Sequence, residues 1–198
     1  MSINNEKKVT CFLPCSNRDN LALTIKELEQ FKEIGSIFII CPNNVEKLYA
    51  KSLPYGCQIL STGFLQQTQS WKEIVPPIDT PYTLLYTNSL PLKLGAYAIE
   101  RMLNVISDTG AGMLYADRYK MKEGLLQPHP VNDYQEGSLR DDFDFGSLLL
   151  FQSSVLKELL SEYPTAIIPF DTVLTALKLS MLFPPKLYFN IMLFSDTE

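Results

Sequence analysis

The sequence contains one histidine, four cysteines and no concentration of basic residues, and these shortages exclude several classes of protein. Its 198 residues carry 17 Lys and Arg against 22 Asp and Glu, which gives a net charge of -5. Without a basic patch there is no electrostatic footprint for a phosphate backbone, so we expect no nucleic-acid partner. No apolar run approaches the roughly eighteen residues of a membrane span, and the start lacks the long apolar segment of a signal peptide. We therefore expect a cytoplasmic protein with no transmembrane segment.

Glycine-rich phosphate loops are also missing. No G-x-G-x-x-G follows a strand, and no G-x-x-x-x-G-K-[ST] occurs, which excludes Rossmann dehydrogenases and P-loop NTPases. A G-x-S-x-G elbow is absent too, and the one histidine, His129, lies between two prolines. Serine or cysteine hydrolase chemistry is therefore disfavoured, and His129 is interpreted as a polar loop residue.

The cysteines do not indicate a metal centre. Cys11, Cys15, Cys41 and Cys57 match none of the usual zinc spacings, and three of them lie in or beside apolar runs. We interpret them as buried, reduced thiols of a cytosolic protein.

The composition and length of the sequence are typical of one globular domain. Hydrophobic residues make up 46% and charged residues 20% of the chain, and its length is sufficient for a substantial core. β-branched and aromatic runs that end in turn residues predict strands at residues 9–13, 36–41, 57–60 and 82–87.

Apolar residues at steps of three and four predict helices between these strands. The clearest are residues 20–35, capped by Asp19 or Asn20 and ended by Gly35, and residues 91–110. Shorter helices are expected at residues 45–53, 153–164 and 171–182. This alternation of strands and helices predicts an α/β protein with a mostly parallel central sheet covered by helices.

The second half of the chain departs from this alternation. A strand is expected to end at Ala116 and to lead into a hairpin that turns at residues 122–124. A glycine- and acid-rich loop at residues 134–144 precedes a strand within residues 145–151, and residues 186–194 predict a last strand.

Ligands of open α/β sheets bind beyond the carboxyl ends of the strands, so polar residues there are candidate site residues. The first strand is followed by Pro14, Ser16, Asn17 and Arg18, in which the arginine can bind a carboxylate or phosphate and the rest can equally be a helix-capping turn. The fourth strand is followed by three neutral residues that make a poor magnesium site, Thr87, Asn88 and Ser89.

Acidic residues gather later in the chain. Asp117 ends a strand beside Arg118, where a surface ion pair or a turn is the alternative interpretation. In the acid-rich loop, alternation places Arg140, Asp142 and Asp144 on one side and Asp141 on the other. Facing carboxylates repel one another unless a metal, another cation or Arg140 lies between them. A solvated loop is the alternative, but such loops rarely interleave aromatic with acidic residues and lead directly into a core strand, which favours a site.

Four segments together resemble the nucleotide-sugar domain of family 2 glycosyltransferases, which have the GT-A fold. They are "TCFLPCSNR", "TPYTLLYTNSLPLKLGAYAIERML", "GAGMLYADRYKM" and "YQEGSLRDDFDFGSLLLFQSSVL", and the likeness extends from about Val9 to Ser180. The resemblance implies a three-layer GT-A-like sandwich that transfers a sugar from a nucleoside-diphosphate donor to a hydroxyl acceptor, with inversion, in polysaccharide biosynthesis. Because family members usually continue further, the single domain is expected to be the first of a longer protein.

The same resemblance implies roles for individual residues. Residues 14–18 fall where the family binds the nucleotide base and ribose, and Asp171 falls on the segment that supplies the general base. The metal-binding D-x-D is replaced by Thr87, Asn88 and Ser89. A divalent metal, Mn or Mg, would then be held by Asp117 or by the Asp141, Asp142 and Asp144 group; otherwise Arg18 and Arg140 would neutralise the diphosphate.

The acid-rich loop then lines the donor-sugar and acceptor side, with Asp141 or Asp142 binding sugar hydroxyls or the metal. Two other functions stay open. A non-catalytic binding or scaffolding module would explain the neutral D-x-D position, and a nucleotidyltransferase shares the sheet but normally opens with a glycine-rich loop that "LPCSNRDN" lacks.

Overall fold

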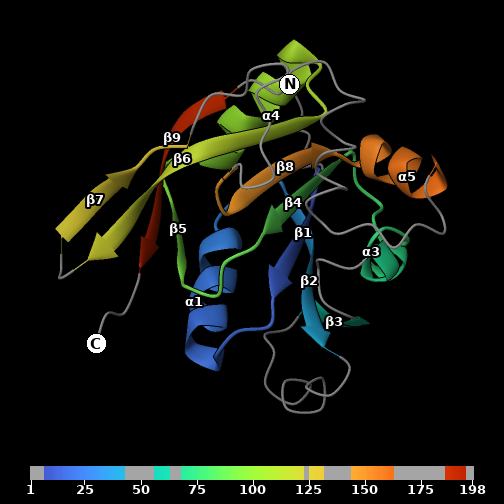
Figure 1. Ribbon diagram of the computed structural model, residues 1–198, viewed down its shortest axis with the longest axis horizontal. Helices are drawn as coiled ribbons and strands as arrows, with labels where there is room; N and C mark the ends of the chain where they lie inside the picture. The colour runs from blue at the N-terminus through green and yellow to red at the C-terminus, as the bar shows by residue number, and fades with distance from the viewer. Residues whose placement is uncertain are drawn as a thin grey trace.

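The computed structural model describes residues 7–42, 56–62, 68–122, 125–131, 144–162 and 186–194. Within them a single mixed sheet passes through the molecule and carries helices on both of its faces (Figure 1). The helices expected at residues 45–53 and 171–182 lie outside the described residues.

The first half of the sheet is parallel, as predicted. Its strands are β1 (Val9–Pro14), β2 (Ile34–Pro42), β3 (Cys57–Thr62) and β4 (Tyr82–Tyr86), and they lie in the order β3-β2-β1-β4. Both faces of β1, β2 and β4 are largely buried, which explains their near-continuous apolar sequences, whereas β3 at the edge of the sheet is mostly half-buried.

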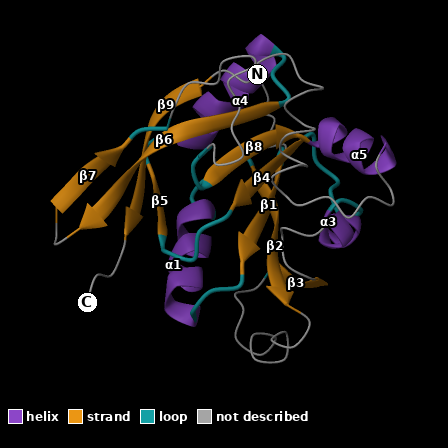
Figure 2. Cartoon of the chain, viewed as in Figure 1, coloured by secondary structure: helices purple, strands orange, loops and turns teal. Residues whose placement is uncertain are grey.

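The second half mixes directions. After β4 the order continues through β8 (Leu148–Gln152), β6 (Met113–Lys122), β9 (Lys186–Phe194) and β5 (Leu92–Leu94), and β7 (Leu125–His129) pairs with β6 off this path. β8 is antiparallel to β4 and to β6, so β6 runs in the same direction as β4. The predicted α/β class with a parallel core is therefore confirmed, with an antiparallel extension (Figure 2).

Side-chain alternation along the strands divides the core into two layers. In β1, Cys11 and Leu13 join the cluster that contains α1 and α4, whereas Phe12 joins the cluster that contains α3 and α5 and stacks on Phe38 at 5.3 Å between ring centroids. The three layers follow from this alternation. The helices are α1 (Arg18–Leu28) and α4 (Ala98–Thr109) on one face, and α3 (Thr68–Ile74) and α5 (Ser153–Glu162) on the other.

The predicted limits of α1 were wrong at both ends. Its N-cap is Asn17, whose side chain accepts a hydrogen bond from the Asn20 backbone N–H at 2.8 Å, not Asp19 or Asn20. The helix ends at Leu28 because the chain must enter β2 early enough for Ile34 to pair with Val9. Gly35 therefore lies inside a strand and is not a helix terminator.

The long helix predicted at residues 91–110 was also too long at its start. Leu92–Leu94 forms strand β5, and α4 begins only at Ala98. The predicted terminator is confirmed, because Gly110 adopts a left-handed conformation at φ 66° directly after the helix.

The strand expected to end at Ala116 continues to Lys122 as β6, and the hairpin after it is confirmed. β6 and β7 pair antiparallel from Arg118 with His129 to Lys122 with Leu125. β6 is longer than expected because its second half has partners on both edges, β7 on one and β9 on the other.

Side chains of α1 complete the free edge of β5. The Leu92 N–H donates to Thr24 Oγ1 at 3.1 Å, and the Leu94 N–H donates to Glu27 Oε1 at 2.8 Å. The Lys93 ammonium donates to the second oxygen, Glu27 Oε2, at 2.7 Å. Helix α1 lies beside β5 (Figure 1), and Glu27, which is only 6% exposed, accepts there the backbone hydrogen bond that a neighbouring strand would otherwise accept.

Replacing Glu27 with Ala should lower the free energy of unfolding by about 1–3 kcal/mol, because the buried Leu94 N–H loses its acceptor. Urea unfolding of the purified variant measures the change. Glu29→Ala is the matched control, since Glu29 follows the same helix and is exposed, and it should cost under about 0.5 kcal/mol. Equal losses in the two variants would show that Glu27 does not support β5.

Candidate functional site

Three segments meet at the carboxyl edge of the parallel strands. The first is the turn from β1 into α1, where the Cys15 N–H donates to the Ile40 carbonyl at 2.9 Å and Asn17 caps the helix. Ser16 is half-buried, and Asn17 and Arg18 are exposed at this edge. Pro14 is the last residue of β1, so it fixes where the turn begins.

The second segment is the loop after β4, and hydrogen bonds join it to the other two. The Asn20 side-chain amide donates to the Ser89 carbonyl at 3.1 Å, and the Thr87 N–H donates to the Ser147 carbonyl at 2.9 Å. Asn88 closes the loop locally by accepting the Leu90 N–H at 3.0 Å. The predicted residues of the first two segments therefore lie side by side.

The third segment, residues 144–147, fills a gap along one edge of β6. Tyr115 pairs with Leu149 of β8 and, on its other side, with β9; Arg118 pairs with His129 of β7 and also with β9. β8 and β7 therefore share the same edge of β6, one after the other, and pairing is interrupted between them. A Cβ on Gly146 would lie 3.2 Å from the Ala116 carbonyl oxygen, so the segment is packed directly into this gap.

The gap brings together three donors around the carboxylate of Asp144. Arg118 Nη2 donates to Oδ2 at 2.7 Å and Nη1 to Oδ1 at 3.4 Å. The Gly146 backbone N–H donates to Oδ1 at 2.7 Å, and His129 Nε2 lies 3.6 Å from Oδ2. Arg118 is buried, with 8% of its side chain exposed, whereas the Asp144 side chain is 54% exposed.

The charges around Asp144 shift two pKa values. Burial alone would raise the Asp144 pKa, but the hydrogen bonds from Arg118 and Gly146 and the charges of Arg118 and His129 outweigh it, so the pKa lies below its ordinary value. The pKa of His129 is also lowered, by burial and by the charges of Arg118 and Lys120, against the opposing effect of Asp144. Near neutral pH, Asp144 is therefore an ionised carboxylate and a weak base.

Asp117 points elsewhere. Arg118 binds Asp144, whereas Asp117 Oδ1 accepts the Val131 N–H at 2.8 Å. Among the described residues no group of three His, Cys, Asp or Glu side chains could hold a metal ion. With Asp117 and Asp144 bound to protein donors and residues 87–89 neutral, these residues do not fit a divalent metal.

Four predicted site residues, Arg140, Asp141, Asp142 and Asp171, lie outside the described residues. The pairing of Arg118 with Asp144 was missed because the two are 26 positions apart in the sequence. The available signal was Asp144 two residues before Gly146, a pattern in which the carboxylate closes a turn on the backbone.

Two of the four cysteines are buried as expected. Cys11 and Cys41 are buried, Cys15 and Cys57 are half-buried, and none forms a disulfide in the described chain. Burial, together with the neighbouring Glu29 charge, raises the pKa of Cys57 to about 11, so its thiol is a poor nucleophile.

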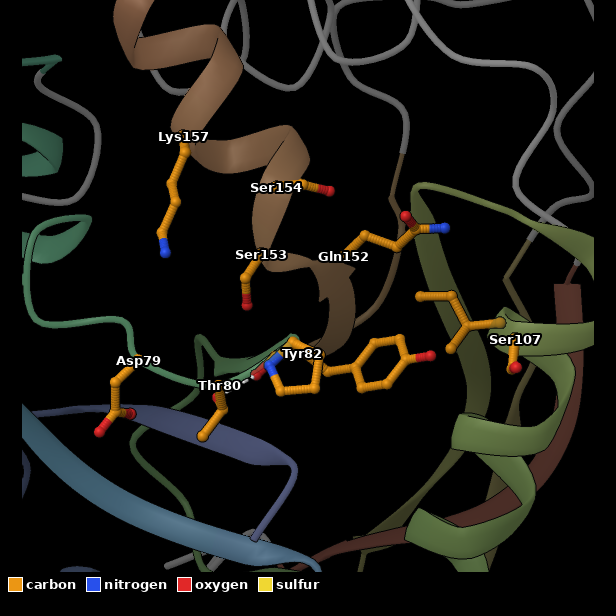
Figure 3. Close-up of a pocket in the computed structure, with 10 residues that line it drawn as sticks. Asp79, Thr80, Tyr82, Ser107, Gln152, Ser153, Ser154 and Lys157 are labelled. Atoms are coloured by element: carbon orange, nitrogen blue, oxygen red, sulfur yellow. Dashed lines mark hydrogen bonds between the residues drawn. The ribbon is translucent and has the colours of Figure 1, made fainter. Parts of the chain in front are cut away.

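The opposite edge of the sheet holds a hollow of about 540 Å³, lined by residues that precede β4 and begin α5 (Figure 3). Its polar groups are partly engaged, since Thr80 Oγ1 donates to the Tyr82 carbonyl at 2.8 Å and Ser153 Oγ lies 2.8 Å from Thr83 Oγ1. None of the predicted site residues lines it. Because α/β sheets bind ligands at the carboxyl ends of their strands, the candidate site is the carboxyl edge and not this hollow.

None of the described helices has the length and apolar character that a membrane crossing requires. No protein-family model and no curated protein matches the sequence.

Solved structures do match the fold. S. aureus TarS 1-349 in complex with UDP-GlcNAc is 10% identical at a TM-score of 0.62, over 96% of this chain and 59% of that one. A 4-diphosphocytidyl-2C-methyl-D-erythritolsynthase from Anaerococcus prevotii is 9% identical at 0.61, over 92% of this chain and 89% of that one. The Francisella tularensis 2-C-methyl-D-erythritol 4-phosphate cytidylyltransferase (IspD) is 9% identical at 0.58, over 92% and 90%. At these identities the likeness shows the fold, and the chain has a GT-A-like α/β fold.

Proposed function

We propose that this chain binds a nucleoside-diphosphate sugar at the carboxyl edge of its sheet and transfers the sugar to a hydroxyl acceptor with inversion. The observation that carries the proposal is the junction of three loops there, in which Asn20 binds the Ser89 carbonyl and Thr87 binds the Ser147 carbonyl. The similarity in fold to TarS, whose structures include UDP and UDP-GlcNAc, supports a nucleotide-sugar donor at this edge.

In the proposed reaction each loop has a distinct task. Ser16, Asn17 and Arg18 bind the base and ribose, and the neutral loop that begins at Thr87 lies under the diphosphate. A carboxylate removes the acceptor proton as the acceptor oxygen bonds to the anomeric carbon, and the bond to the diphosphate breaks on the opposite face. We assign this base role to Asp171, as the resemblance implies, and the binding of sugar hydroxyls or a metal to Asp141 or Asp142.

Asp144 is not the base in this proposal. Its carboxylate already accepts from Arg118 and Gly146, and its lowered pKa makes it a poor proton acceptor. In this proposal Asp144 lies on the donor-sugar side of the site, where an ionised carboxylate can bind or orient the sugar. A metal at residues outside the described part of the chain remains part of the proposal.

Nucleoside diphosphates should stabilise the folded chain, because a ligand that binds only the native state raises its melting temperature. A thermal-shift screen with UDP, GDP, CDP and TDP, each with and without Mn²⁺, should give a shift of about 2 °C or more for one base at saturation. A shift that requires Mn²⁺ would assign a metal to the acid-rich loop. No shift with any nucleotide would favour the non-catalytic module.

Introducing the two D-x-D carboxylates tests whether the loop after β4 faces the diphosphate. Thr87→Asp with Ser89→Asp places two carboxylates on exposed positions, and UDP binding should then become at least about tenfold tighter with Mn²⁺. Titration calorimetry with and without Mn²⁺ measures the gain. The control is the pair Ser107→Asp and Ser154→Asp, which adds the same charges at the opposite edge. If both variants respond equally to Mn²⁺, the loop after β4 does not face the diphosphate.

A nucleotidyltransferase is the second candidate, because this chain spans 89% and 90% of the two structures of the cytidylyltransferase type but only 59% of TarS 1-349 in its complex with UDP-GlcNAc. The two reactions release different products. Pyrophosphate released from CTP or UTP in the presence of a sugar phosphate or polyol phosphate would support this candidate. Nucleoside diphosphate released from a nucleotide sugar would support glycosyl transfer.

A further inference from the structure

The carboxylate of Asp144 occupies a position that is built like an anion-binding site. Its two oxygens receive the Arg118 guanidinium and the Gly146 backbone N–H, both at 2.7 Å at their nearest, and His129 Nε2 lies at 3.6 Å. These donors come from two neighbouring strands, β6 and β7, and from the segment before β8, so the sheet itself holds them together. We refer to Arg118, Gly146 and His129 as the anion cradle.

Arg118 is the fixed member of the anion cradle because its side chain is buried and packed against Gly146. Only 7% of the residue is exposed, and its neighbour Gly146 is so close that an added Cβ would lie 3.4 Å from Nη1. Its Nε is buried and has no hydrogen-bond acceptor in the described structure. A buried guanidinium that lacks a full set of acceptors is strongly attracted to an anion.

Asp144, unlike Arg118, is open to solvent. Its side chain is 54% exposed, and it stands at the start of the segment that leads into β8. The cation is thus fixed while its carboxylate partner faces solvent, so exchange of the partner requires movement of one exposed side chain only. Because a guanidinium binds carboxylate and phosphate through the same two-pronged geometry, another anion can take the same place.

We propose that the anion cradle binds an anionic group of the substrate, a phosphate or carboxylate, and that Asp144 is an exchangeable internal ligand that occupies the cradle when substrate is absent. The assignment of this anion to the substrate rests on the proposed function. Binding of a free anion does not, because it depends only on the three donors. The cradle supplies positive charge at the site where the described residues do not fit a metal.

The test removes the internal ligand. Asp144→Ser should lower the melting temperature in chloride buffer, because Arg118 is left buried and unpaired. Inorganic pyrophosphate at matched ionic strength, with EDTA present, should restore it. Titration calorimetry should show pyrophosphate binding at least about tenfold tighter than in the unmodified chain, since the competing carboxylate is gone. A purely structural Asp144 predicts the loss without the restoration.

Two controls separate the anion cradle from a general effect of salt. Asp144→Ser combined with Arg118→Met replaces the ion pair by an apolar side chain of similar length, so the double variant should fold yet gain nothing from pyrophosphate. Glu27→Ala disrupts a second ion pair with one buried partner, Glu27 with Lys93, and its melting temperature should respond to pyrophosphate as the unmodified chain does. The proposal is overturned if Asp144→Ser binds pyrophosphate no more tightly than the unmodified chain, or if the double variant binds it equally well.

Two further titrations identify which substrate group the cradle takes. In Asp144→Ser, displacement of pyrophosphate by UDP points to the donor diphosphate, and displacement by methyl glucuronide points to an acidic sugar. If pyrophosphate binds but neither UDP nor methyl glucuronide displaces it, the cradle does not bind an anionic group of the substrate. If pyrophosphate binds but no nucleotide stabilises the unmodified chain, the proposed function fails and the cradle stands.

The ionisation of Asp144 gives an independent prediction about stability. The carboxylate faces Arg118 and His129, and Lys120 lies near enough to His129 to affect its charge. Because the Asp144 pKa is lowered in the folded state, its stabilising effect is present above the ordinary carboxyl pKa of about 4 and is lost as pH falls through the folded value. Urea unfolding of the unmodified chain and of Asp144→Asn should therefore differ most at pH 5–7, and the difference should shrink toward pH 3.5. A constant difference over this range would contradict the lowered pKa.

Discussion

The interruption along one edge of β6 is the constraint on which the candidate site depends. β8 pairs with the first residues of this strand and β7 with the last, so a short stretch around Ala116 and Asp117 has no strand beside it on that edge. Segment 144–147 enters there and is packed so closely that only glycine fits at position 146 without displacing its neighbours. The same interruption sets the buried Arg118 opposite the exposed Asp144, which places a positive charge beside a core of mostly apolar side chains.

Carboxylates accept backbone N–H groups at three places where the regular strand pairing stops. Glu27 accepts the Leu94 N–H at the edge of β5, Asp117 accepts the Val131 N–H just after β7, and Asp144 accepts the Gly146 N–H. A buried N–H without an acceptor costs free energy, so the fold needs such groups at its irregular positions. An acidic side chain near the site is thus not free for a metal or a proton merely because it lies there. This is why the described acids around the site do not form a metal centre even though the chain has an acidic net charge.

The sequence predicted the parallel core well because its signals are local. Strands β1 to β4 are apolar runs that end in turn residues, and α4 ends at Gly110 as expected. Errors arose where a distant partner overrides the local pattern: Leu92–Leu94 has helical spacing with the residues after it, yet Thr24 and Glu27 of α1 hold it as a strand. The cradle could not be predicted for the same reason, because Arg118, His129 and Asp144 meet only through the pairing of β6 with β7 and β8.

The neutral loop after β4 and the buried Arg118 of β6 both concern how the negative charge of the diphosphate is neutralised. A departing diphosphate needs positive charge, which in the family that the chain resembles is provided by a metal held on two carboxylates. Here the corresponding residues, Thr87, Asn88 and Ser89, carry no charge, while within the described part of the chain Arg118 forms its ion pair with the exposed carboxylate of Asp144. Displacing Asp144 would give the site one net positive charge without any metal, and the positive charge would act at short range because Arg118 is desolvated. A guanidinium fixed between two strands is also already oriented, so the free energy of anion binding need not be spent on ordering it.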